Sequence, residues 1–327
     1  MRAAADRAAG VGQPGCGGGP PGGGGSNPPG WGGARDPVCS PVEAHLRHPE
    51  NHLPNRPRDR RHPEWEGVHR MAGGNGVSGD LLEQFKSTVQ RRDAVGLRSL
   101  LRAVPALSAH VNDPIFDFNS RAVIQARQDP DVVEVLLEHG ADLNLKSEWW
   151  AGGFGVLDET EPEAARFLIE RGAVLDACSA AGLGLLDRLR EIVAADSSRV
   201  NEWGGDGKRP LHFAATRAVV DFLVSRGADL EARDLDHGGT PAEWAVRERP
   251  EVCRRLLWLG AKGSIHLSVA LNDRGTVRDL LARDPALVHA WTSGTAPGGH
   301  VHTYTGIGVP SQPLHVAARF DRPQLAA

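Results

Sequence analysis

The dipeptide Gly-Ala recurs along this chain at a nearly constant spacing. It begins at Gly140, Gly172, Gly227 and Gly260, and the first and last intervals are 32 and 33 residues. The middle interval is 55 residues, which leaves room for one further, degenerate unit. A regular period of this length indicates a solenoid of stacked units, in which each unit contacts only its neighbours.

An amphipathic stretch precedes each Gly-Ala pair. Before Gly140, the apolar residues at positions 132, 133, 136 and 137 would lie on one face of a helix. Glycine ends such a helix well, because it adopts the left-handed conformation without steric cost. We therefore expect each of the four glycines to terminate a helix.

A second motif opens the units. The segments Arg-Pro-Leu-His-Phe-Ala-Ala, Gly-Thr-Pro-Ala-Glu-Trp-Ala and Gln-Pro-Leu-His-Val-Ala-Ala begin at residues 209, 239 and 312. Proline suits the first turn of a helix, and a threonine before it can cap the free amides. Here the sequence resembles the ankyrin-repeat family, in a divergent bacterial type, whose period is about 33 residues and whose signature is Thr-Pro-Leu-His-x-Ala. The residues that would carry this structural motif are Pro210, Leu211, His212, Thr240, Pro241, Pro313, Leu314 and His315.

The resemblance implies an all-α ankyrin-repeat solenoid, with stacked helix–loop–helix units and short β-hairpin fingers. It covers residues 78–327, where we expect one continuous core, about seven repeats and an incomplete C-terminal repeat. That end of a monomeric array would be sticky, since no polar unit caps it. Three units end without Gly-Ala and are interpreted as a second repeat subtype. The expected units are 80–113, 114–147, 148–177, 178–207, 208–238, 239–264 and 265–312, followed by a fragment at 313–327.

Residues 1–75 have a different composition and are predicted to be disordered. The first 34 residues hold 13 glycines and five prolines, and the following segment is rich in Arg, His and Pro without periodicity. Such a segment cannot bury enough apolar surface to offset its conformational entropy. Met71 is the only methionine after Met1 and lies where the periodic sequence begins. One hypothesis is that Met71 is the true start; the alternative is a genuine disordered arm.

Charge and cysteine content limit the possible partners and location. Residues 1–70 carry net +2, and the remaining 257 residues carry net −6. An acidic body argues against nucleic acid and against a membrane surface as partners. No apolar run approaches the roughly 20 residues that a membrane span needs. The four cysteines are far apart in sequence, which favours a reducing compartment, and we expect a cytoplasmic protein.

No motif indicates catalysis, a metal or a cofactor. The resemblance implies that His212 and His315 are structural. Cys39 with the nearby histidines 45, 48 and 52 lacks a second close cysteine, and the pair His300 and His302 lacks a third ligand. Residues 204–208 resemble a phosphate loop only superficially, because the Gly-x-x-x-x-Gly-Lys-Ser/Thr frame is missing. We therefore expect no enzyme activity, no metal and no cofactor.

Tryptophans mark the predicted fingers. Trp149, Trp150, Trp203 and Trp291 each follow the end of a unit. Because tryptophan is enriched at binding hot spots, they could form a row that faces a partner. The alternative is that each packs on a neighbouring finger or helix. Trp244 and Trp258 lie within predicted helices and are expected in the core.

One loop is much longer than a finger requires. Residues 292–311 contain His300, His302 and Tyr304, the only tyrosine of the chain. A long loop inside a compact array is usually functional or disordered. With Trp291, it is the segment that we expect to form a special contact surface.

These observations favour a protein-binding adaptor or scaffold that recognises an unidentified protein through its concave face and fingers. The alternative is a regulatory or targeting subunit of an enzyme, or an enzyme with its site in residues 292–311. A nucleic-acid role ranks third because of the acidic body. Fold alone does not fix function, so the choice depends on the residues of the site.

Overall fold

A computed structural model describes residues 77–292, 294, 296–297 and 299–325. The expectations for residues 1–75, including disorder and a start at Met71, lie outside the described residues. The described residues all belong to the second of two compact units, 64–327. No helix in them is long and apolar enough to cross a membrane.

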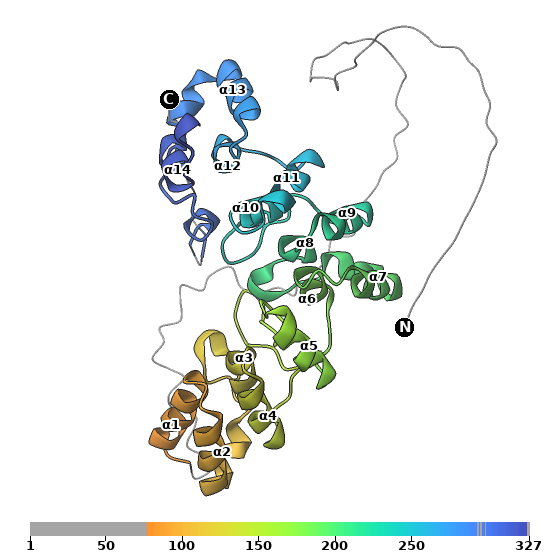
Figure 1. The fold of residues 1–327 in the computed structure, drawn as a ribbon, viewed down its shortest axis with the longest axis vertical. Helices are drawn as coiled ribbons and strands as arrows, with labels where there is room; N and C mark the ends of the chain where they lie inside the picture. The colour runs from red at the N-terminus through yellow and green to blue at the C-terminus, as the bar shows by residue number, and fades with distance from the viewer. Residues whose placement is uncertain (1–76, 293, 295, 298, 326–327) are drawn as a thin grey trace, which may run out of the picture. The chain divides into compact units, whose positions relative to one another are not determined.

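The described part of the chain is built from short helices (Figure 1). The α-helices are α1 (Gly79–Gln90), α2 (Ala94–Ala103), α3 (Ala122–Ala126), α4 (Pro130–Glu138), α5 (Pro162–Glu170), α6 (Ala177–Gly182), α7 (Leu186–Ala195), α8 (Pro210–Phe213), α9 (Arg217–Ser225), α10 (Pro241–Ala245), α11 (Pro250–Trp258), α12 (Ile265–Ala270), α13 (Arg274–Arg283) and α14 (Pro313–Arg319). The 3₁₀ helices are η2 (Pro105–His110), η3 (Asp117–Asn119), η4 (Ser197–Asn201), η5 (Gly205–Gly207), η6 (Pro285–His289), η7 (Val301–Thr303) and η8 (Pro323–Leu325).

Most helices form the expected stacked pairs. Helix α6 packs on α7, α8 on α9, α10 on α11 and α12 on α13, and α6, α8 and α10 also stack on one another. We call α6, α8 and α10 the inner helices. The unit expected at 148–177 differs, because a turn stands before α5 where the first helix of the pair would lie.

The fingers are present without β-strands. In the described residues the one isolated bridge joins Phe116 and Ser120, and no strand is formed. The expectation of β-hairpin fingers is therefore wrong in this detail. Instead of pairing internally as a ladder, the finger loops bond to one another.

We call the loops 113–121, 145–158, 202–209, 232–240 and 292–311 the finger row. The connections at 171–176 and 259–264 are too short to form a finger. The loop 145–158 extends across the first gap to the loop 202–209, and the loop 292–311 extends across the second gap back to the loop 232–240. One or more backbone hydrogen bonds join each consecutive pair of loops. The N–H of Glu148 donates to Asn119 (3.0 Å), that of Asp206 to Gly152 (3.3 Å), that of Leu235 to Asp206 (2.9 Å) and that of Val301 to His237 (3.2 Å).

The Gly-Ala pairs close their helices in one shared geometry. Gly227 follows α9 with φ of 90°, and the N–H of Ala228 donates back to Leu223 over 3.0 Å. This is the pattern in which a left-handed residue lets the chain satisfy the last carbonyls of a helix. Gly140, Gly172 and Gly260 also have positive φ.

Asparagines connect successive units at these helix ends. Asn201 Nδ2 donates to the carbonyl of Gly227 (3.1 Å), and Asn201 Oδ1 accepts from the N–H of Asp229 (3.4 Å). Asn112 and Asn144 make the same two contacts with the following Gly-Ala segments. We call this arrangement the asparagine clamp. In each case the acceptor is the carbonyl of the glycine in the next Gly-Ala pair, whichever repeat subtype the asparagine belongs to.

The hydrophobic core consists of two clusters rather than the single one expected. One cluster extends from Val77 to Ala173, and the other from Ala177 to Ala317. Leu175 packs against both. The division falls at α5, where the unit has only one α-helix and offers less apolar surface to its neighbours.

Candidate functional site

A pocket of about 350 Å³ lies where the inner helices meet the finger row. Helix α6 contributes Cys178 and Gly182, α8 contributes Phe213, and α10 contributes Trp244. The long loop 145–158 supplies Asp158 at its end. The pocket therefore combines aromatic rings with a buried acid, and its walls come from segments far apart in sequence.

Asp158 is the buried acid of this pocket, whereas the two other acids that line it, Glu159 and Glu248, are exposed. The residue is 7% exposed, and Asp158 Oδ2 accepts a hydrogen bond of 2.7 Å from the N–H of Gly155. Burial raises the pKa of its carboxyl to about 6, and the hydrogen bond from Gly155 opposes this. A cation brought next to Asp158 would relieve the cost of keeping it ionised.

The two basic residues of the pocket already have partners. Lys208 Nζ lies 3.2 Å from Asp206 Oδ2 and 3.9 Å from the centre of the Trp244 ring. The Arg249 guanidinium donates to the carbonyls of His212 and Ala214 over 2.9 and 2.8 Å. Burial lowers the pKa of Arg249. The pocket is therefore chemically suited to a basic side chain that would pair with Asp158.

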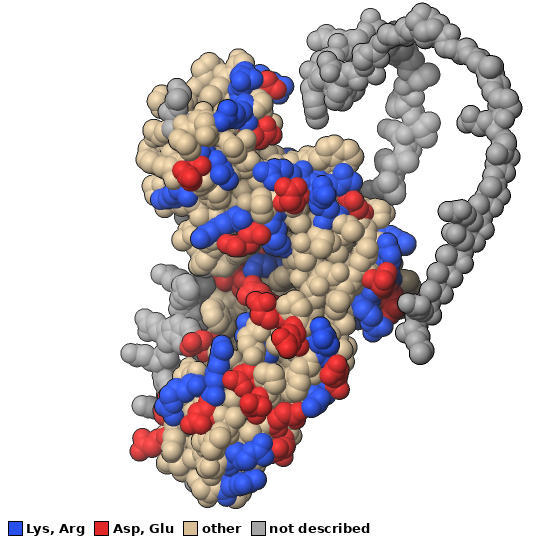
Figure 2. Space-filling model, viewed as in Figure 1, with Lys and Arg blue, Asp and Glu red and all other residues tan. Residues whose placement is uncertain are grey.

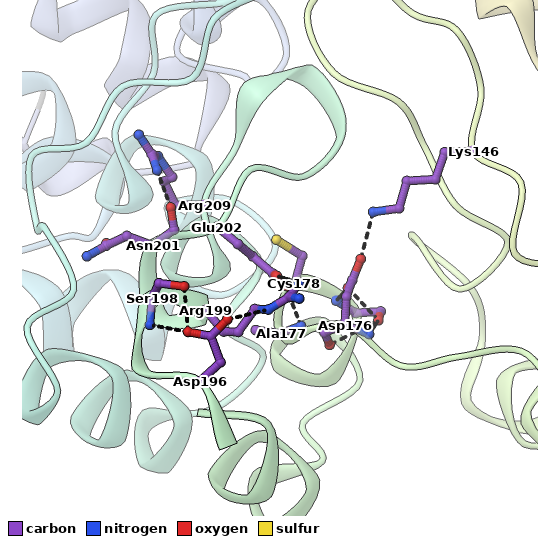
Figure 3. A network of polar contacts seen from close by, with 11 residues as sticks. Lys146, Asp176, Ala177, Cys178, Asp196, Ser198, Arg199, Asn201, Glu202 and Arg209 are labelled. Carbon is purple, nitrogen blue, oxygen red and sulfur yellow. Dashed lines mark hydrogen bonds and ion pairs between the residues drawn. The ribbon is translucent and has the colours of Figure 1, made fainter. Parts of the chain in front are cut away.

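A polar network beside the pocket is structural (Figure 3). Asp176 caps α6 through the N–H of Ser179 and pairs with Lys146 Nζ at 2.7 Å. Glu202 Oε1 accepts from the N–H groups of Ala177 and Cys178. Burial raises the pKa of the Cys178 thiol well above its usual value, so it stays protonated. These groups fix the first turn of α6, which forms one side of the pocket.

Several aromatic residues of the predicted contact surface are exposed. Trp150, Trp203, Trp291 and Tyr304 keep 41–53% of their surface accessible. Each also touches a neighbour: the Arg209 guanidinium lies 3.4 Å from the Trp203 ring centre, and Tyr304 lies 4.4 Å from the ring of His237. No described contact joins the three exposed tryptophans to one another, so the structure does not gather them in one cluster.

Other residues of the predicted surface are turned inward. His302 is 6% exposed, and burial lowers its pKa to about 3. Trp149 is half-buried against Phe118, with ring centres 4.9 Å apart. Both residues pack within the finger row. His300 is partly exposed, and its ring lies 4.7 Å from that of His302.

Trp258 was expected in the core but is 73% exposed, with the Arg255 guanidinium 4.1 Å from its ring centre. Trp258 follows Val252 by six residues, and this spacing turns it away from the buried face of α11. Trp244 is partly buried, and its Nε1 donates to Asp234 Oδ2 over 2.8 Å.

The motif residues lie at the starts of the inner helices and of α14. His212 is buried and bridges two units: its Nδ1 accepts from the N–H of Arg209, and its Nε2 lies 3.1 Å from the carbonyl of Gly239. Burial lowers the pKa of His212 to about 4. His315 accepts from Gln312 in the same way but is exposed. The remaining motif residues are buried except for one leucine: Pro210, Leu211, Thr240, Pro241 and Pro313 are inside, and Leu314 is outside.

The loop 292–311 contributes to the core as well as to the surface. Val301, Ile307 and Ser311 are fully buried. A side chain added at Gly239 would meet Val301 at 2.6 Å, which shows how closely the loop lies on the finger at 232–240. The loop therefore supports the neighbouring finger in addition to carrying Tyr304.

Basic and acidic side chains alternate over the visible face of the molecule (Figure 2). This face has no broad basic stripe of the kind that non-specific nucleic-acid binding requires.

The sequence did not point to Asp158, Lys208 or Arg249 as neighbours. For Asp158 and Lys208 the only available signal was their setting in long or Gly-rich finger loops, which carry no fixed spacing, and Arg249 stands directly before α11, outside the fingers. Trp244 was assigned to the core, yet it forms part of the pocket wall.

Comparison with known proteins supports the repeat assignment. The model of the Ankyrin repeat family matches residues 206–235, which hold η5, α8 and α9 with the Pro210 motif and the Gly227 helix end. A search of curated proteins finds no match. The matched repeat shares the asparagine clamp with the helix ends at Gly140 and Gly172. The chain is therefore an ankyrin-repeat-containing protein.

Proposed function

We propose that this protein binds a protein partner through the inner helices and finger row, and that the pocket takes a lysine or arginine side chain of that partner. Ankyrin repeats are in general protein–protein interaction modules. The observation that carries the finer proposal is Asp158, a buried carboxyl beside an aromatic wall whose own cations are already paired.

The aromatic residues extend this surface. Trp244 and Phe213 already have Lys208 Nζ over their rings, at 3.9 and 5.8 Å from the ring centres, so they would pack against the aliphatic stem of the incoming side chain. The exposed Trp150, Trp203, Trp291 and Tyr304 are proposed as further contacts along the finger row. Partner binding would then depend on one charged anchor and several aromatic contacts around it.

The test uses immobilised peptides with a central lysine or arginine between apolar residues. The matched peptides carry glutamate or norleucine at that position. The full chain is expected to bind the basic set, and Asp158→Asn is expected to weaken this binding at least about tenfold, or about 1.4 kcal/mol. Trp258→Ala is the control, because Trp258 is exposed and does not line the pocket.

Binding should also depend on pH. Below the pKa of about 6, Asp158 is protonated and its attraction for a cation is lost. Affinity for basic peptides should therefore fall between pH 7.5 and pH 5 in the wild type and change little in Asp158→Asn. Equal binding of acidic and basic peptides, or an unchanged affinity in Asp158→Asn, would refute the proposed pocket specificity.

A further inference from the structure

Two loops of the finger row bring two carboxylates and an imidazole together in the protein interior, and a third loop contacts the imidazole. Asp206 comes from the loop 202–209, and Asp236 and His237 come from the loop 232–240. His237 Nε2 lies 3.9 Å from Asp206 Oδ2 and 3.7 Å from Asp236 Oδ2. All three residues are at most 8% exposed.

The tautomer of neutral His237 is fixed by the third loop. His237 Nδ1 lies 3.1 Å from the carbonyl oxygen of Gly299, in the loop 292–311. A carbonyl can only accept, so Nδ1 carries the proton and Nε2 presents its lone pair. That lone pair faces two carboxylate oxygens. An imidazole held through Nδ1 by a backbone carbonyl is the usual arrangement of a metal-ligating histidine.

The carboxylates do not have enough partners among the described residues. Asp236 is 4% exposed, and its Oδ1 has no hydrogen-bond partner within 3.5 Å among them. The nearest donor is the indole of Trp149, whose buried Nε1 is also unpaired and lies close enough to interact with the Asp236 carboxyl. Asp234 lies nearby and accepts from the backbone of His237 and Gly239. Asp206, Asp234 and Asp236 carry three negative charges when ionised, and Lys208, which pairs with Asp206, supplies one positive charge. The excess is two negative charges.

The second group of metal-ligating side chains makes a useful contrast. Asp176, Cys178 and Glu202 also lie close together, but their carboxylates accept from Lys146, Ser179, Arg199 and the amides of α6. That group is therefore satisfied from within the chain. In the group at Asp206 the acceptor atoms face one another, and one carboxylate oxygen, Asp236 Oδ1, has no hydrogen-bond partner among the described residues.

We propose that Asp206, Asp236 and His237 bind one divalent metal ion, with Zn²⁺ the best match, and that this ion cross-links the loops 202–209 and 232–240. Zn²⁺ accepts carboxylate oxygen and imidazole nitrogen at about 2.0–2.2 Å, which places ligand atoms of a tetrahedral site about 3.3 Å apart. His237 Nε2 lies 3.9 and 3.7 Å from the two carboxylate oxygens, so shifts of about 0.4–0.6 Å would bring these atoms to that spacing. A divalent ion also neutralises the excess charge of the cluster.

The experiment is a zinc titration of the full, chelator-stripped protein by calorimetry, with metal content measured after dialysis. Wild type is expected to bind one zinc ion in this site, and Asp236→Asn and His237→Gln are expected to weaken that binding at least about tenfold. His300→Gln is the control, because His300 lies in the loop 292–311 that contacts His237 but is none of the three ligands. All variants keep the histidines of residues 1–76, so zinc bound there stays constant.

Two further measurements keep the proposal testable if a variant is poorly folded. Zinc should raise the melting temperature of wild type but not that of Asp236→Asn, whose stripped form should be at least as stable as wild type. Cobalt bound to wild type should give a spectrum of nitrogen and oxygen ligation without a thiolate band, and a thiolate band would assign the metal to a cysteine instead. Equal zinc affinity in wild type and Asp236→Asn, or no zinc binding by wild type, would overturn the proposal.

Discussion

Replacing Asp158 by asparagine should stabilise the protein, and the gain should grow with pH. The buried carboxyl has a pKa of about 6 in the folded protein and 3.8 as its ordinary value. Because the pKa of this acid is higher in the folded state, the folded protein keeps the proton up to a higher pH than the unfolded chain does. Stability is therefore lost as pH rises from about 4 to above 6, because the folded protein must then carry a buried charge.

The size of the effect follows from the difference between the two values. About two pKa units correspond to about 3 kcal/mol at pH 8, where both states are ionised. At pH 4 the same difference leaves only about 0.5 kcal/mol. Asparagine keeps an oxygen that can accept from Gly155, and any cost of its new N–H₂ group does not depend on pH. The change between pH 4 and pH 8 is therefore the informative quantity.

The assay is urea unfolding followed by circular dichroism across this pH range. Asp158→Asn should gain about 2–3 kcal/mol relative to wild type between pH 4 and pH 8. Asp187→Asn is the matched control, because the side chain of Asp187 is 89% exposed and its ion pair with Arg190 is a surface pair. A gain that is the same at both pH values would refute the argument, as would no gain at pH 8.

Two further predictions concern the repeat scaffold, both measured by urea unfolding. Leu211→Ala should cost about 2–5 kcal/mol, because this leucine is 1% exposed, whereas Leu314→Ala at an exposed site should cost under about 1 kcal/mol; similar losses at the two sites would contradict the assigned core. Gly227→Ala should cost about 1–2 kcal/mol, because its φ of 90° strains any residue with a Cβ. Gly263 does not have a positive φ, so Gly263→Ala is the control. An equal loss of stability in Gly263→Ala would refute the argument from backbone strain.

Local signals explain which parts of the fold the sequence could predict. The glycine at Gly227 and the proline at Pro210 act on residues next to them, so their roles follow from spacing alone. The helix ends and starts therefore appear where the motifs predict them. The missing strands and the lone α5 depend on contacts between loops, which no local pattern encodes.

The candidate site could not be predicted for the same reason. Asp158 and Arg249 lie on one pocket but 91 positions apart in the chain, and no periodic pattern connects them. The loop 145–158 brings Asp158 there by extending across a missing finger. Sequence reasoning found the aromatic residues of the fingers because tryptophan is conspicuous, but it could not separate half-buried Trp149 from exposed Trp150.

The asparagine clamp has a consequence for how such an array can diverge. Asn112 and Asn144 reach the carbonyl of a glycine 28 residues later, whereas Asn201 makes the same contact over 26 residues. The clamp therefore sets the distance between neighbouring layers without fixing the number of residues that connect them. Helices and fingers inside one layer are free to shorten or lengthen while the layers stay in step. A chain built this way can keep its architecture while its repeats drift away from a common length and sequence.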